Sequence, residues 1–430
     1  MQLLHPDDIP NLVYANDRGE INNFPELSMA GRSGNFFLKP HPDDLIPLPE
    51  GSELFLLPDR RPIGIPPGDD NPVVLDHVPG APREKIQAVA AFMAPAHTAV
   101  HTAAYEPAKN DLPPLPLFAY TAVGWLNGKF WVSAFRSDPD NRQDAHCFDQ
   151  EKIKKKTVRL LKKNPKNRLI QHLGKCCLTY GCPAARNYFL GRWEAPLPTS
   201  PLCNARCVGC ISLQTSGCCP ATQDRISFVP RVSEIAALAV PHLKKAPRAI
   251  VSFGQGCEGE PLLQARILQK AIGAIRAQTE RGTVNLNSNA SLPGKIKMLA
   301  ESGLDSLRVS LNSARAEYHA RYYRPVDFSF VDVLESIDLM KKAGKFVSLN
   351  YFILPGFTDD PHEFAAFCRL VEDHHPDLIQ LRNLNMDPDW YLETVKYRPD
   401  TPPMGIRNWL AELKQLFPKL RFGYFNPFLG

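Results

Sequence analysis

Apolar and polar positions change their pattern near residue 193 of this 430-residue chain. Beyond that point, short apolar runs alternate with longer segments in which apolar residues recur every three to four positions. The short runs predict buried strands, and the longer segments predict amphipathic helices. Strands are expected at residues 193–198, 248–253, 283–287, 306–311, 345–351 and 378–383.

Helical patterns lie between these strands. The segment SEIAALAVPHLKK begins at Ser233, a candidate N-cap, and Pro241 is expected to kink or end this helix. Gly303 and Gly344 stand where two later helices should end. Six β–α repeats predict parallel strands joined by helical crossovers. The simplest α/β arrangement is a partial (β/α)6 barrel of the TIM type, and an open doubly wound sheet is the alternative.

The rest of the chain lacks this alternation. Because 20 of the 41 prolines fall in the first 139 residues, residues 1–150 are expected to form an irregular, partly β N-terminal region. Its clearest element is a hairpin with the turn signal Asn127–Gly128. Residues 151–192 are expected to be a basic helix and a cysteine-containing connector. Residues 193–385 then form the barrel, and residues 386–430 form a short C-terminal cap.

Composition narrows the class of protein. Hydrophobic content of 44%, charged content of 22% and a net charge of +5 are typical of a soluble globular protein. There is no signal-like N-terminus and no apolar run long enough to span a membrane, so we expect a cytoplasmic protein. Cytosolic thiols stay reduced, so the 11 cysteines do not predict disulfides. Their concentration between Cys176 and Cys219 instead indicates metal or redox chemistry.

The segment PLCNARCVGCISL places Cys203, Cys207 and Cys210 in the spacing C-x3-C-x2-C directly after the first predicted strand. In a β/α barrel, that loop lies on the face where active sites are built. Three thiolates on a four-iron cluster leave one iron without a protein ligand, and an open position is typical of a catalytic metal. A structural zinc site is the alternative, with Cys218 or Cys219 as its fourth ligand.

The segment CNARCVGC resembles the signature of the radical SAM superfamily, and the resemblance covers roughly residues 193–385. It implies a [4Fe–4S] cluster on Cys203, Cys207 and Cys210 whose open iron binds S-adenosylmethionine (SAM). It also implies an enzyme that reductively cleaves SAM to a 5'-deoxyadenosyl radical, which removes a hydrogen atom from a substrate. The competing class is a non-catalytic iron–sulfur or zinc protein for electron transfer or binding.

A second motif, FGQGCEGEPLL, follows the second predicted strand. It is similar to the family's Gly-Gly-Glu-Pro element, which holds the amino group of the methionine part of SAM. Gly259, Glu260 and Pro261 match this element, while Glu258 replaces its first glycine. An ordinary strand–helix turn is the alternative explanation, because Glu and Pro are common at the start of a helix.

Further cofactor contacts are expected at the ends of later strands. Polar residues there favour a polar pocket, since amides are costly in a dry core. An apolar Pro-Gly turn after the fifth strand is similar to the family's adenine-binding element. The candidates are Asn287, Ser310, Asn312, Ile353 and Gly356. The sequence departs from the family at Gly209, where an aromatic residue usually precedes the third cysteine, so Phe357 or Ile353 is the expected adenine contact.

The remaining cysteines and the basic segment leave alternatives open. Cys176, Cys182 and Cys219 are candidates for a second iron–sulfur cluster, or they are small buried residues. Residues 151–173 are either a solvated helix face or a contact for RNA or another anion. The substrate therefore stays open among a small metabolite, a peptide and RNA. The expected electron donor is a protein such as flavodoxin or ferredoxin.

Overall fold

The computed structural model describes residues 8–78, 84–214, 219–399 and 401–430. The chain divides into two compact units. The first comprises Met1–Ala145, Phe352–Cys368 and Leu381–Pro418, and the second comprises His146–Tyr351, Arg369–Gln380 and Lys419–Gly430.

The first unit is built mainly from antiparallel strands. They are β1 (Asn11–Ala15), β2 (Ile21–Met29), β3 (Gly31–Ser33), β4 (Phe36–Leu38), β5 (Leu45–Pro47), β6 (Glu53–Leu57), β7 (Arg60–Ile65), β8 (Val73–Val74), β9 (Gln87–Phe92), β10 (His97–Ala99), β11 (Thr102–Ala103), β12 (Tyr105–Pro107), β13 (Val123–Leu126) and β14 (Lys129–Arg136). Most of them join one sheet with the central order β10-β14-β13-β1-β2-β7-β12, while β11, β3 and β4 form a smaller sheet. The β structure expected in the N-terminal region is confirmed, and it is more extensive than the sequence indicated.

The predicted hairpin is formed by β13 and β14. Leu126 pairs with Lys129 across the turn. Asn127 and Gly128 adopt φ angles of 51° and 76°. Two successive positive φ angles are what a tight two-residue hairpin turn requires, so Asn-Gly was a reliable signal here.

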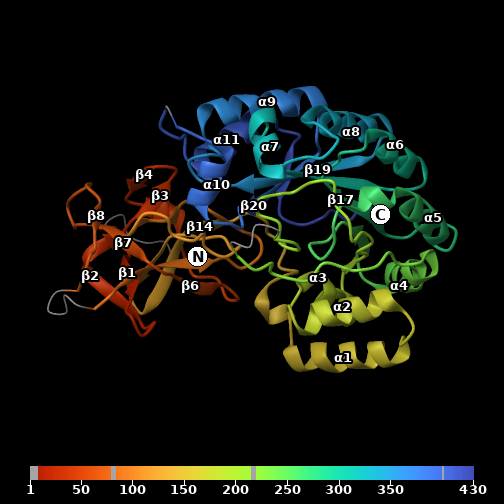
Figure 1. Cartoon of the computed structure of the whole chain (residues 1–430), viewed down its shortest axis with the longest axis horizontal. Helices are drawn as coiled ribbons and strands as arrows, with labels where there is room; N and C mark the ends of the chain where they lie inside the picture. Colours follow the sequence, from red (N-terminus) through yellow and green to blue (C-terminus); the bar gives the residue numbers. More distant parts are fainter. Residues whose placement is uncertain (1–7, 79–83, 215–218, 400) are drawn as a thin grey trace. The chain divides into compact units, whose positions relative to one another are not determined.

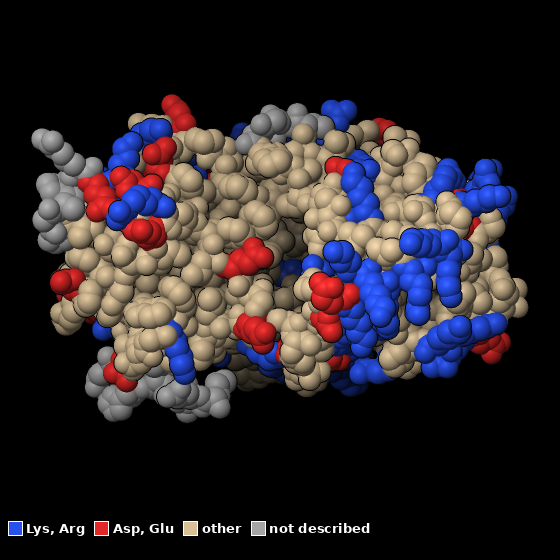
Figure 2. Space-filling view, turned by 90° about the horizontal axis from the view of Figure 1, so that it is seen from below, with Lys and Arg blue, Asp and Glu red and all other residues tan. Residues whose placement is uncertain are grey.

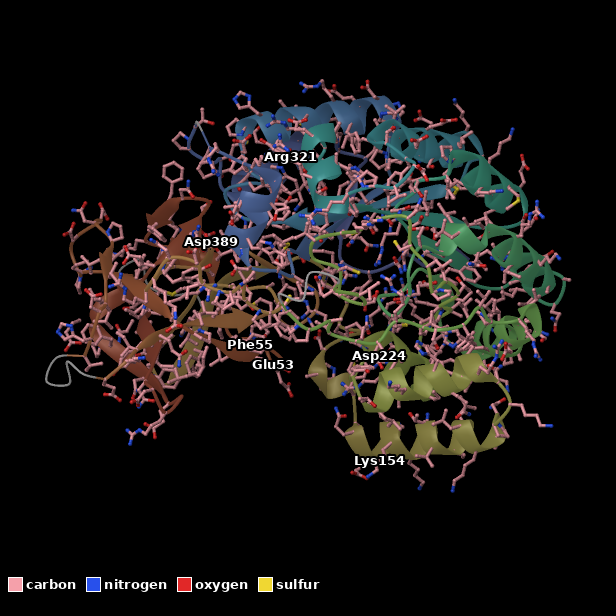
Figure 3. The ribbon with its side chains drawn as sticks, in the orientation of Figure 1. Glu53, Phe55, Lys154, Asp224, Arg321 and Asp389 are labelled. Carbon is pink, nitrogen blue, oxygen red and sulfur yellow. The ribbon has the colours of Figure 1, made fainter. Side chains whose placement is uncertain are left out.

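Helices from the C-terminal part of the chain complete the first unit. These are α10 (Pro388–Val395), α11 (Ile406–Leu416) and the first part of α9 (Pro361–His374), and a short 3-10 turn, η1, lies at Pro42–Asp44. Two ion pairs connect α10 and its N-cap to the β strands: Arg60 with Asp387 at 2.9 Å, and Arg32 with Asp389, which Figure 3 labels. The segment expected to be a short C-terminal cap therefore contains the two helices α10 and α11.

The second unit contains a parallel sheet. Its strands are β15 (Glu194–Pro196), β16 (Ile250–Phe253), β17 (Thr283–Ser288), β18 (Ser306–Leu311), β19 (Phe346–Ile353), β20 (Leu378–Asn383) and β21 (Arg421–Gly423), with the ends of β19 and β20 counted in the first unit. Their spatial order follows the chain from β15 to β21. A doubly wound sheet would reverse its order at a switch point, so the partial barrel is confirmed. No pairing closes it between the described residues of β15 and β21.

Six of these strands match the prediction, and β21 does not. It lies in the segment expected to be only a cap, and it pairs in parallel with β20, with Leu378 opposite Arg421. Three residues are too few for a periodic pattern, which is why the sequence did not reveal this strand.

Helices alternate with the strands of the second unit. They are α1 (Gln150–Lys163), α2 (Arg168–Leu178), α3 (Pro183–Leu190), α4 (Val232–Lys245), α5 (Ala265–Arg276), α6 (Pro293–Glu301), α7 (Ala316–Tyr323) and α8 (Phe330–Lys342), with 3-10 turns η2 (Ala145–Cys147) and η3 (Pro261–Gln264). In Figure 1, α4, α5, α6 and α8 follow one another around the outside of the strands. Gly303 and Gly344 follow the ends of α6 and α8 with φ angles of 103° and 66°, as predicted.

The start of α4 corrects one prediction. The N-cap is Arg231 and not Ser233, because the Glu234 carboxylate accepts a hydrogen bond from the Arg231 backbone at 2.7 Å. The helix also continues through Pro241 to Lys245 instead of ending there.

The basic segment forms two helices where the sequence suggested one. Asn167 begins α2 by accepting a hydrogen bond from the Ile170 backbone at 3.1 Å. Gly174 lets α2 pack closely on α1, since a Cβ there would lie 2.6 Å from Leu161 Cδ2. Figure 2 shows Lys and Arg gathered on the face where α1 lies. No helix among the described residues is long and apolar enough to span a bilayer.

Strand β17 illustrates how the barrel places polar side chains inside. All of its residues are buried. Val284 and Leu286 lie on one face of the strand, and Asn285 and Asn287 lie on the other, because successive side chains alternate.

Candidate functional site

The three predicted cluster ligands lie on one irregular loop between β15 and α4. Cys203, Cys207 and Cys210 are all partly buried on this loop. Arg225, from the same connection, donates from Nη2 to Cys210 Sγ at 3.5 Å and from Nε to Ser212 Oγ at 3.1 Å. The loop therefore holds its thiols beside a fixed positive charge.

Backbone hydrogen bonds fix this cysteine loop against the end of α7. Arg206 N donates to Tyr323 O at 2.9 Å, and Val208 N donates to Tyr322 O at 3.1 Å. Val326 N, just after α7, donates to Asn204 O at 2.8 Å. These bonds pair the loop's backbone on one side without using any cysteine side chain.

Gly259 and Glu260 fix the loop on its other side. Gly259 N donates to Ser200 O at 2.7 Å, and Glu260 N donates to Leu202 O at 2.8 Å. A Cβ atom at position 259 would lie only 2.0 Å from Leu202 O and 3.1 Å from Cys203 N. Only glycine permits this approach between two backbones. The two motifs that the sequence identified separately are therefore joined by direct contact.

The Glu260 carboxylate connects the same turn to β17. Its Oε1 accepts from Ser288 Oγ at 2.7 Å and from Leu262 N at 3.0 Å, and its Oε2 accepts from Asn289 N at 2.9 Å. Pro261 follows as the first residue of η3 and is buried. Burial raises the pKa of Glu260 to about 7, although these hydrogen bonds oppose the shift. A carboxylate has about four acceptor positions, so one remains for a further donor.

Glu258 is a buried acid of this site to which the sequence analysis assigned no role. Its Oε2 accepts from Thr199 N, Thr199 Oγ1 and Ser200 N at 2.7, 3.1 and 2.9 Å. Its Oε1 accepts from Gly254 N at 2.6 Å and from Gln255 N at 3.0 Å. Burial raises its pKa to about 7 against these bonds. The residue that replaces the family's first glycine thus joins the loops after β15 and β16. The available signal in the sequence was an acidic residue within a glycine-rich turn.

The asparagine row on β17 provides polar groups inside the barrel. Asn285 Nδ2 donates to Asn287 Oδ1 at 2.9 Å, and Asn289 Nδ2 donates to Asn204 Oδ1 on the cysteine loop at 3.0 Å. Asn287 Nδ2 is buried and has no hydrogen-bond partner among the described residues. A buried amide donor normally has a partner, so this atom is suited to bind a ligand acceptor.

The two candidates associated with β18 differ in their surroundings. Asn312 is fully buried just beyond the strand and donates from Nδ2 to Tyr318 O at 3.2 Å, at the start of α7. Ser310 is partly buried and lies opposite Asn350 of β19. Asn312 therefore connects strand and helix, and a cofactor contact remains a prediction for both residues.

Ile353 and Gly356 belong to the first unit and are described with it. Gly356 has a φ of 86°, and a Cβ there would lie 1.9 Å from Gly34 N in the turn between β3 and β4. Its carbonyl accepts from Tyr397 Oη at 2.9 Å. Ile353 is buried, and its carbonyl accepts from Leu384 N at 3.0 Å. Each residue thus has a packing role in its own unit, and adenine contact stays a prediction.

Phe357, the other predicted adenine contact, is also packed in the first unit. Its ring lies 5.2 Å from that of Tyr391 and 5.1 Å from that of Tyr397, both edge to face. The ring is buried, so these two contacts explain it without a cofactor.

The electrostatics of the triad suit a positively charged group. Burial, followed by the charge of Glu260, raises the pKa of Cys203 to about 11. Burial and the neighbouring thiols Cys203 and Cys210 raise the pKa of Cys207 well above its usual range. Thiols in this environment keep their protons until a metal stabilises the thiolates.

The spacing of the sulfur atoms bears on the choice between zinc and a cluster. Among the described residues, only His172, Cys176 and Cys257 bring three possible ligand atoms within 4.8 Å of one another. The sulfur atoms of the triad do not form such a close group. Thiolates on one zinc ion lie about 3.8 Å apart, as Zn–S bonds of about 2.3 Å require. Thiolates of a four-iron cluster bind separate irons, so the triad fits a cluster.

The other predicted cysteines are only partly brought together. Cys182 N donates to Cys176 O at 3.1 Å, so these two lie close. Cys219 is buried but is not part of the close group around Cys176. Cys218, the other candidate for a zinc ligand, lies outside the described residues. The second cluster stays a prediction.

Comparison with known proteins agrees with this site. Residues 197–368 match the family model of the Radical SAM superfamily. A GTP 3',8-cyclase of Lactiplantibacillus plantarum is 28% identical over 178 residues, which cover 40% of this chain and 48% of the relative. A probable dual-specificity RNA methyltransferase RlmN of Synechococcus sp. is 26% identical over 162 residues, covering 36% and 45%.

Similar solved structures include a radical SAM methyltransferase from Sphaerobacter thermophilus, with 13% identity and a TM-score of 0.38. The match covers 54% of this chain and 66% of that one. The chain spans about half the length of the curated relatives it matches.

The segment that matches the family model contains the cysteine triad, the turn at Gly259 and Glu260, and strands β16 to β19. Within this segment, hydrogen bonds join the cysteine loop to the turn at Gly259 and Glu260, and both resemble motifs of the family. Residues 197–368 therefore match the radical SAM superfamily, both in the family model and in the two segments that resemble its motifs.

Proposed function

We propose that this protein is a radical SAM enzyme, with a [4Fe–4S] cluster on Cys203, Cys207 and Cys210 and with SAM as cofactor. When bound, the reduced cluster and SAM supply a 5'-deoxyadenosyl radical that removes a hydrogen atom from the substrate. The chain's own residues hold these groups in place. The alternative is an iron–sulfur or zinc protein that only transfers electrons or binds a partner.

One observation carries the proposal: the cysteine loop and the Gly259–Glu260 turn are hydrogen-bonded to each other. A cluster-binding loop alone needs no second loop with acceptors beside it. Glu260 has an acceptor position left for an ammonium group, and Asn287 Nδ2 offers a buried donor. An electron-transfer protein would leave both features unexplained.

The test is reductive cleavage of SAM by anaerobically reconstituted protein. We expect about four irons per chain, a change in the cluster's EPR signal on adding SAM, and 5'-deoxyadenosine after reduction by dithionite or a flavodoxin. Clustered protein that shows neither the EPR change nor cleavage would support the non-catalytic alternative. About eight irons per chain would support the second cluster predicted from Cys176, Cys182 and Cys219.

Replacing Cys207 by alanine should remove cluster and cleavage together, because each thiolate binds its own iron. Cys147→Ser is the matched control, since Cys147 lies in η2, outside both motifs. Iron content and 5'-deoxyadenosine are measured for both variants. Cleavage retained in the Cys207 variant would mean that another ligand set holds the cluster.

For the substrate we propose a nucleotide or nucleic acid. The relatives are named as GTP cyclases and an RNA methyltransferase, although each matches only in part. The lysines of α1 also support an anionic substrate. The exposed lysines on α1 and the following turn are Lys152, Lys154, Lys155, Lys162, Lys163 and Lys166. Lys154 lies on the outer side of α1 in Figure 3.

Binding of a labelled structured RNA and of GTP tests this substrate class. If RNA is the substrate, affinity should fall with salt, and Lys155→Glu with Lys162→Glu should weaken binding at least about tenfold. Lys342→Glu on α8 is the matched control, because that lysine is also exposed. Equal loss in both variants, or no binding of either ligand, would argue for a peptide or another small metabolite.

A further inference from the structure

A group of metal-ligating side chains lies outside the cysteine loop. His172 and Cys176 are four residues apart on α2 and therefore share one face of that helix. Cys257, from the loop after β16, lies opposite them. Their possible ligand atoms are all within 4.8 Å of one another, and Cys176 Sγ lies 3.5 Å from His172 Nε2. All three residues belong to the second compact unit.

Simple packing does not account for the composition of this group. Buried cysteines often behave as small apolar residues, and Cys176 and Cys257 are only 1% and 3% exposed. A histidine nitrogen directed at a buried thiol pair is different, since it adds a polar ligand to two soft ones. Mixed nitrogen and sulfur ligands are the set that zinc prefers in proteins.

The distances favour one ion over a cluster. Tetrahedral bonds of about 2.3 Å to sulfur and about 2.0 Å to nitrogen place ligand atoms about 3.5 to 3.8 Å apart. The observed limit of 4.8 Å is within side-chain rotation of that geometry. Thiolates of an iron–sulfur cluster on separate irons would need to move apart instead.

Cys182 is the candidate for the fourth ligand. It is the N-cap of α3, and its backbone N donates to Cys176 O at 3.1 Å, which brings it beside the group. The neighbouring Cys177 is engaged elsewhere, with its Sγ 3.4 Å from Thr157 Oγ1 between α1 and α2. A Cys₃His set is a common structural zinc site.

We propose that His172, Cys176, Cys182 and Cys257 bind a single zinc ion. The ion connects α2 and the start of α3 to the loop after β16. The residue after Cys257 is Glu258, whose carboxylate accepts hydrogen bonds from both loops of the cofactor site. The zinc therefore fixes the base of that site, from a position outside the cysteine triad. The ion pair of Lys175 on α2 with Asp224, which Figure 3 labels, joins α2 to the connection between β15 and α4.

The test separates this zinc from the iron of the proposed cluster. A variant with Cys203, Cys207 and Cys210 all changed to alanine is purified without oxygen, dialysed against a weak chelator, and analysed for zinc and iron. We expect about one zinc and almost no iron per chain. Loading the same variant with Co²⁺ alone should give a sulfur-to-cobalt charge-transfer band and the visible bands of tetrahedral cobalt.

Variants of the zinc ligands identify the site. In the triple-alanine background, Cys257→Ser and His172→Gln should each lower retained zinc at least tenfold. His172→Gln still tests the proposal if the buried cysteine variant fails to fold, because His172 is only partly buried. Cys368→Ser, in α9, is the matched control and should retain zinc.

Four outcomes overturn the proposal. The first three are the absence of zinc in a folded triple-alanine variant, zinc that survives both ligand substitutions, and a disulfide between Cys176 and Cys257 shown by thiol counting. The fourth is iron that depends on Cys257, which would favour a second cluster. Failure of SAM cleavage in the wild-type protein would reject the proposed function and leave the zinc result unaffected.

Discussion

Replacing Gly259 by alanine is expected to separate the two loops of the cofactor site. The new methyl group would lie 2.0 Å from Leu202 O, whereas ordinary contacts begin at 3.4 Å, so the backbones must part by about 1.4 Å. That movement breaks the bonds from Gly259 N and Glu260 N to the cysteine loop. Two backbone hydrogen bonds and the overlap together should lower the free energy of unfolding by about 2–4 kcal/mol.

The effect on chemistry should exceed the effect on stability. A displacement of about 1 Å in a catalytic arrangement can cost about 100-fold in rate, so SAM cleavage should fall at least tenfold. The assay measures iron per chain, 5'-deoxyadenosine and urea unfolding on the same preparation. Gly273→Ala in α5 is the matched control, because a Cβ there meets nothing within 4 Å. Gly259→Ala protein with normal iron, cleavage within twofold and unchanged stability would refute this account of the two loops.

Three further predictions use other parts of the structure. Arg60→Ala should cost about 3–5 kcal/mol in urea unfolding, because it leaves the buried Asp387 carboxylate unpaired, whereas Arg407→Ala at a more exposed pair should cost under about 1 kcal/mol. Equal costs for the two variants would show that burial does not determine how much stability the loss of an ion pair removes. Burial raises the pKa of Asp359 to about 6 from 3.8, so the folded protein binds an extra proton and the unfolding free energy should fall, by up to about 3 kcal/mol, as pH rises from about 4 to 6. Asp359→Asn should remove that slope, and an unchanged slope would assign it to other groups. Glu258→Gln sets an amide donor against backbone donors, so iron content and SAM cleavage should both drop at least tenfold, and wild-type values would contradict its role in joining the loops.

Much of the second unit's fold could be predicted because each of its elements leaves a local signal. Buried parallel strands give continuous apolar runs, and six of the seven strands were found from them. In the first unit, the pair Asn127 and Gly128 likewise encodes its own backbone angles. Strand β21 and the N-cap of α4 were missed, since the first is too short for a pattern and the second depends on one side chain returning to Arg231.

The site was predictable only as far as its motifs are local. The triad spacing, the turn at Gly259 and the glutamate beside it stand in short segments of sequence. The role of Glu258 was not visible, because its five donors come from two loops about 55 residues apart. His172 gave no signal at all, since its link to Cys257 exists only after α2 packs beside the loop that follows β16.

The sequence alone therefore determined three thiols at fixed spacing, a Gly-Glu-Pro turn, and an alternation of strands and helices that builds a partial barrel. These are properties of neighbouring residues, so chain order is enough to encode them. Which acids are buried, which amide is left without a partner, and which cysteine meets a histidine depended on tertiary structure. Burial and through-space distance decide those matters, and both arise only when distant segments pack together.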